Sequence, residues 1–129
     1  MTFSKIATMA EIRTHLIKNT PPDASLANRA GRMAADHDQH RHLVKICDGR
    51  YLAGALLYQR IADQLSGEPQ VGALTVAALC ALNGGNPGLA ARAITRLEVL
   101  ANRRHIEVSP LVDILKIDHR IAEQLHHSV

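Results

Sequence analysis

The sequence predicts an all-α fold, a compact bundle of about six or seven helices that forms a single domain over residues 1–129. Apolar residues make up 47% of the chain, and they recur at the three- and four-residue spacing typical of helices. Pro, Gly and Asn clusters divide the chain into helix-length segments, and no segment sustains the alternation of a strand. A chain of 129 residues can bury a core without disulfides or metals.

The first predicted helix begins with a capping box in the stretch TMAE, where Thr8 and Glu11 each accept a hydrogen bond from the other's backbone amide. This helix runs to about Asn19 and lies in the N-terminal part of the domain, residues 1–20. The stretch TPPD then stops it, because proline cannot continue a helix. A second helix is expected from about residue 23 or 25 to residue 35.

Two further helices are expected before the centre of the chain. The third covers about residues 36–47 and ends at an Asp-Gly pair. The fourth covers about residues 50–66, and the turn sequence SGEP follows it.

The fifth and sixth helices are predicted to form an αα-hairpin over residues 69–104. The fifth, at about 69–83, has no charged residue between positions 71 and 82, so we expect it to be the central, buried helix. The stretch NGG stops it, and an Asn-Pro pair starts the sixth helix, which runs to about Arg104. Two such helices joined by a short link predict tetratricopeptide-like packing.

A seventh helix is expected from Pro110 to about His126. Asp118 falls on its apolar face, where a carboxylate needs a partner. Arg104 interrupts the apolar stripe of the sixth helix, so we expect a structural ion pair between Asp118 and Arg104.

The stretches HRHLVKICDGRYLAGALLYQRIADQL (40–65) and ALTVAALCALNGGNPGLAARAITRLEVL (73–100) together resemble a family found in actinobacteria. They are similar to the C-terminal half of domain-of-unknown-function family 4192, and the resemblance covers about residues 24–118. It implies a helical fold and a bacterial origin, and it implies no activity. The chain departs from the family in lacking its N-terminal half and the acidic-Pro link after the hairpin.

The stretch DHDQHRH holds three of the eight histidines. On a continuous helix, Asp36 with His40 and Asp38 with His42 are acid–histidine pairs at i, i+4, which support solvated helix faces. We therefore predict no metal site. The alternative is a metal-dependent hydrolase that uses His37, Asp38 and His40 as ligands, although such sites draw three or four ligands from more than one element.

The sixth helix carries Arg92, Arg96 and Arg103 on one stripe beside its apolar face. Together with Arg60, these residues are the predicted binding surface. We expect a non-enzymatic protein-interaction module, an adaptor or modulator of bacterial, plasmid or phage origin. The alternative is a nucleic-acid-binding accessory protein, which the net charge of +3 and the two tyrosines favour less than a protein partner.

Cys47 and Cys80 match no disulfide or metal spacing and are expected to be buried thiols of a cytoplasmic protein. No cofactor is expected. No apolar run approaches the ~20 residues of a membrane span, and the N-terminus lacks the apolar region of a signal peptide. A homodimer remains open, because exposed faces of small residues allow helices to associate.

Overall fold

The computed structural model describes residues 4–109 and 112–113, and within these residues it contains six α-helices, one 3₁₀ turn and no strand. The elements are α1 (Lys5–Lys18), α2 (Ala24–Ala34), η1 (His37–Gln39), α3 (His40–Lys45), α4 (Tyr51–Asp63), α5 (Gly67–Asn83) and α6 (Pro87–Arg104). The predicted all-α class is confirmed. No helix among the described residues is long and apolar enough to cross a membrane.

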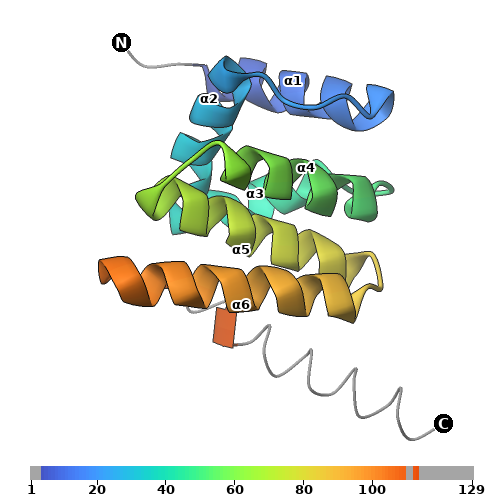
Figure 1. Cartoon of the computed structure of the whole chain (residues 1–129). Helices are drawn as coiled ribbons and strands as arrows, with labels where there is room; N and C mark the ends of the chain where they lie inside the picture. The colour runs from blue at the N-terminus through green and yellow to red at the C-terminus, as the bar shows by residue number, and fades with distance from the viewer. Residues whose placement is uncertain (1–3, 110–111, 114–129) are drawn as a thin grey trace, which may run out of the picture.

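The helices are stacked, with α1 at one end of the described part of the chain and α6 at the other (Figure 1). Helix α5 lies between α4 and α6, and it also contacts α2 and α3. The predicted hairpin of α5 and α6 is present, and its loop is Gly84, Gly85 and Asn86. Its tetratricopeptide-like packing stays a prediction.

Helix α5 is the central helix, as predicted. Every residue from Val71 to Ala78 is buried, and so are Cys80 and Ala81. A helix with apolar residues on every face is stable only when other helices surround it. Each Å² of apolar surface that is buried stabilises the fold by roughly 25 cal/mol, and an exposed apolar side chain loses this stabilisation.

Small residues let the backbones of neighbouring helices approach α5 closely. A Cβ atom at Gly72 would lie 2.0 Å from the carbonyl oxygen of Ala34 and 2.4 Å from its carbon. The hairpin interface with α6 is lined by alanines such as Ala77, Ala90 and Ala93, which are buried. The position of α5 against the end of α2 therefore depends on a residue without a side chain.

The predicted capping box at Thr8 is wrong, because α1 begins one turn earlier. Ser4 is the N-cap, and its hydroxyl accepts a hydrogen bond from the Ala7 amide at 3.2 Å. Thr8 is buried inside the helix, where its hydroxyl donates to the Ser4 carbonyl at 2.9 Å. Glu11 forms an ion pair with Arg29 of α2, which ties the two helices together.

The predicted continuous helix over residues 36–47 is also wrong. The Asp36 carboxylate accepts a hydrogen bond from the Asp38 amide at 3.0 Å, and this local turn competes with helical hydrogen bonding. The segment therefore begins as η1 and becomes α-helical only at His40, and α3 has six residues.

The other boundaries agree with the sequence or differ by a few residues. Helix α6 has the predicted bounds, with the Asn86 side chain accepting from the Leu89 amide at 3.0 Å and Pro87 as the first helical residue. The predicted seventh helix, 110–126, lies almost wholly outside the described residues, although Val112 is buried in the core.

We predict that replacing Gly72 by alanine destabilises the protein by about 2–3 kcal/mol, because the new Cβ meets backbone atoms of α2 that cannot rotate away. Replacing Gly88 by alanine is the matched control, since a Cβ there has no neighbour closer than 3.7 Å and alanine favours the helix by up to about 1 kcal/mol. Urea unfolding of both variants measures the difference. Equal stabilities would contradict the close contact of α2 and α5.

Candidate arginine groove and acidic pocket

The outward side of α6 carries a shallow groove with a volume of about 560 Å³. Its floor is formed by Ala91, Thr95, Val99 and Leu100. The side chain of Val99 is 45% exposed, which is unusual for a valine in a packed helical domain. The buried side of α6 packs on α5, and Leu100 of the groove also packs against the core.

Three arginines line this groove, and we call these residues together with the floor the arginine groove. They are Arg92, Arg96 and Arg103, and all three are exposed. Their spacing of four and then seven residues places them along one side of a helix. The sequence prediction that they share a stripe agrees with their position, whereas their role in binding is a proposal.

Arg96 forms an ion pair with Asp63 at the C-terminal end of α4, with 2.7 Å between guanidinium nitrogen and carboxylate oxygen. Their side chains are 41% and 60% exposed, so the pair contributes at most about 1 kcal/mol. The ion pair holds the Arg96 side chain against the end of α4. No ion pair among the described residues holds Arg92 or Arg103, so their guanidinium groups face solvent.

The other two arginines singled out from the sequence lie elsewhere. Arg60 is exposed on α4, three residues before Asp63, and does not line the groove. Arg104 is exposed in the last turn of α6. Its proposed partner Asp118 lies outside the described residues, so that ion pair is untested.

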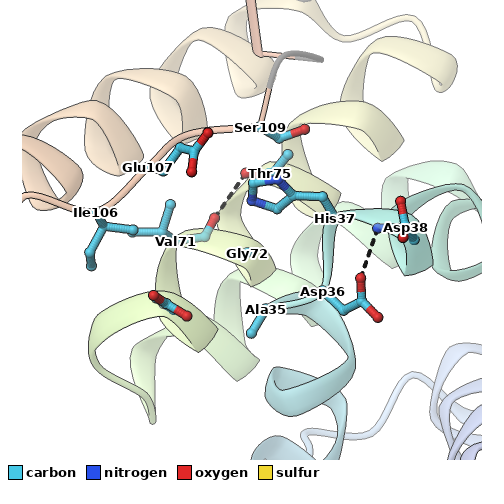
Figure 2. A pocket seen from close by; sticks show the side chains of 11 residues that line it. Ala35, Asp36, His37, Asp38, Val71, Gly72, Thr75, Ile106, Glu107 and Ser109 are labelled. Carbon is cyan, nitrogen blue, oxygen red and sulfur yellow. Dashed lines mark hydrogen bonds between the residues drawn. The ribbon is translucent and has the colours of Figure 1, made fainter.

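A second hollow of about 340 Å³ lies where η1, α5 and the segment after α6 meet (Figure 2). Four carboxylates line it, from Asp36, Asp38, Glu68 and Glu107, and we call it the acidic pocket. The imidazole of His37 projects into the hollow from η1 (Figure 2).

His40 is a buried histidine rather than a residue of a solvated helix face, which corrects the paired arrangement expected for it. Its Nε2 lies 2.6 Å from the carbonyl oxygen of Ala34. A carbonyl only accepts hydrogen bonds, so Nε2 carries the proton and Nδ1 is left as a buried acceptor without a partner in the described structure. Burial lowers the pKa of His40, with a smaller lowering from the neighbouring His37.

The three residues of the metal alternative do not form a ligand set. The rings of His37 and His40 have centroids 5.5 Å apart, but His40 Nε2 is committed to the Ala34 carbonyl. Asp38 is exposed on η1. In the described residues, no group of three or more His, Cys, Asp or Glu side chains is placed to hold a metal ion.

Two cysteines whose spacing in the sequence predicted no contact lie close together in the structure. Cys47, in the turn after α3, and Cys80, in α5, are both free and fully buried. Each thiol affects the ionisation of the other, so they are neighbours in the core. A separation of 33 residues carries no signal of this contact, which depends on how α3 and α4 pack on α5.

We predict that His40 makes the protein less stable as the pH falls. The pKa of His40 is lower in the folded chain than in the unfolded chain, so the unfolded chain binds more protons below its ordinary pKa of about 6.5. The free energy of unfolding should therefore fall between about pH 7 and pH 5, by up to about 1.4 kcal/mol for each unit of pKa difference. His40→Gln should flatten this slope, measured by urea unfolding across that range.

His42→Gln is the matched control for that measurement, because His42 is exposed in the same helix. It should keep the wild-type slope. The same slope in wild type and His40→Gln would show that burial of His40 is not the source of the pH dependence.

No family model, curated protein or solved structure was found to match the chain. The resemblance to the C-terminal half of domain-of-unknown-function family 4192 therefore stays a prediction.

Proposed function

We propose that the protein is a non-enzymatic interaction module whose arginine groove docks an acidic, amphipathic segment of a protein partner. The observation that carries this proposal is the combination of an apolar floor at Val99 and Leu100 with three arginines on one helix face. A partner helix with apolar residues at i, i+3 and i+4 and flanking carboxylates would complement both parts.

The floor favours protein over nucleic acid as the partner. Phosphate contacts need positive charge and gain nothing from an exposed valine, whereas a peptide's apolar side chains gain from burial against it. The net charge of +3 is modest for a nucleic-acid-binding domain.

Arginine suits this role because its planar guanidinium binds a carboxylate through two parallel hydrogen bonds. Arg92 and Arg103 have no ion pair to break among the described residues, so they can engage a partner at little cost. Arg96, held by Asp63, supplies a positioned donor between them. A cytoplasmic location is part of the proposal, and the free thiols of Cys47 and Cys80 support it.

We predict that Arg92→Glu with Arg103→Glu weakens partner binding at least ~10-fold, which corresponds to ~1.4 kcal/mol. A photo-crosslinking amino acid at Thr95, on the groove floor, would capture the partner in the native host and identify it by mass spectrometry. The purified partner is then titrated against each variant. Arg13→Glu with Arg32→Glu is the matched control, because it makes the same change in net charge at exposed sites on α1 and α2.

Three outcomes would contradict the proposal. Equal loss of binding in both double variants would indicate a general charge effect. Captured nucleic acid, with affinity that falls steeply as salt rises, would favour the accessory-protein alternative. A cross-link from position 95 to residues of the same chain, or to a second copy, would show that the groove is already occupied or is a homodimer contact.

A further inference from the structure

The cysteine pair lies at the point where three elements meet. Cys47 follows α3, Cys80 belongs to α5, and Gly54 of α4 packs against both. A Cβ atom built on Gly54 would lie 2.6 Å from Cys47 Sγ and 3.4 Å from Cys80 Sγ. Both sulfurs therefore surround one small volume, which is open only because residue 54 has no side chain.

The Cys47 and Cys80 sulfurs already lie close together in the core, because both approach the Gly54 position. The hydrogen bond that the Cys47 thiol donates to the Leu43 carbonyl is weak, at 3.5 Å, so it does little to hold the sulfur away from Cys80. Cys47 also lies in the turn between α3 and α4 rather than inside a long helix. Cys80, by contrast, lies inside the central helix, in its last turn.

The surroundings distinguish the two thiols chemically. Interaction with Cys80 lowers the pKa of the Cys47 thiol, whereas the same interaction and burial raise the pKa of the Cys80 thiol. Cys47 also lies in the α3–α4 turn, whereas Cys80 lies inside α5, so Cys47 is the stronger candidate for the nucleophile. Burial raises the pKa of the Tyr58 hydroxyl, which has no hydrogen-bond partner in the described structure, and charge on either sulfur raises it further.

A surface hollow of about 280 Å³ lies beside the pair. It is lined by Val44, Asp48 and Tyr51 on either side of Cys47, and by Leu79 and Asn83 of α5 around Cys80. Arg41 and Lys45 also line it, so its rim carries two positive charges. Neither sulfur lines this hollow, so a small oxidant must pass the side chains that cover the two buried thiols.

We propose that Cys47 and Cys80 form an oxidisable dithiol, which a small peroxide converts into an intramolecular disulfide between the α3–α4 turn and α5. The Cys47 thiolate attacks one peroxide oxygen, the O–O bond breaks, and the other oxygen leaves as water with the proton lost by Cys47. Cys47 is then a sulfenic acid. The Cys80 sulfur attacks the Cys47 sulfur, the S–O bond breaks, and the departing hydroxide takes the Cys80 proton to form a second water.

In the overall reaction, one peroxide is reduced to two waters, and the two thiols are oxidised to one disulfide. Two electrons pass from the thiols to the peroxide. The resulting bond would join the edge of the domain to its central helix. The fold holds the two sulfurs together, so the folded chain should favour the disulfide over the unfolded chain by mass action.

The first experiment treats the full-length chain with hydrogen peroxide and analyses it by intact mass and non-reducing peptide mapping. The expected product is a monomer whose mass is about 2 Da lower, with the Cys47 peptide linked to the Cys80 peptide, and dithiothreitol reverses it. Cys47→Ala and Cys80→Ala, checked for folding by circular dichroism, should each give no such product. Peroxide adducts or intermolecular dimers without the internal link would overturn the proposal.

The second experiment needs no variant. The wild-type chain is equilibrated in glutathione redox buffers, once folded and once in concentrated urea, and the fraction of disulfide is measured after acid quenching. The folded chain should form the disulfide at a ratio of reduced to oxidised glutathione at least ~10-fold higher than the unfolded chain. An equal or lower ratio in the folded chain would mean that the fold strains the bond, and the dithiol assignment would be wrong.

Discussion

The fold depends on the close contact between the backbone of α5 at Gly72 and the carboxyl end of α2 at Ala34. Helix α5 has more buried residues than any other helix in the described part of the chain, and α2, α3, α4 and α6 all contact it. The contact also fixes the chain as it leaves α2. His40 can reach back to the Ala34 carbonyl only because that end of α2 is held against α5, and one side of the acidic pocket is built from the same junction.

The sequence predicted the elements whose boundaries depend on local chemistry. The bounds of α6 follow from an Asn-Pro start, and the burial of α5 follows from its lack of charge. The errors occurred where two local signals compete. Ser4 and Thr8 are both good N-cap residues, and in the structure Ser4 caps the helix while the Thr8 hydroxyl accepts a hydrogen bond from Arg29 of α2. Asp36 prefers to bind a nearby amide rather than continue a helix, and periodicity alone does not detect this.

The candidate sites also fall into two groups: features of a single helix, which spacing predicts, and contacts between helices, which it does not. The common face of Arg92, Arg96 and Arg103 is a property of one helix, so spacing predicted it. The ion pair of Arg96 with Asp63, the burial of His40 and the contact of Cys47 with Cys80 each join different helices. No single-helix pattern contains that information, and all three required the tertiary structure.

The scarcity of aromatic residues has a consequence for observing this molecule. The chain has no tryptophan and two tyrosines, and Tyr58 is fully buried whereas Tyr51 lies near the surface. The near-ultraviolet circular dichroism of the folded core therefore arises mainly from one ring. Tyr58 belongs to α4 and is buried in the same core as Cys47 and Cys80, so its near-ultraviolet signal should report on packing in this core without an added dye.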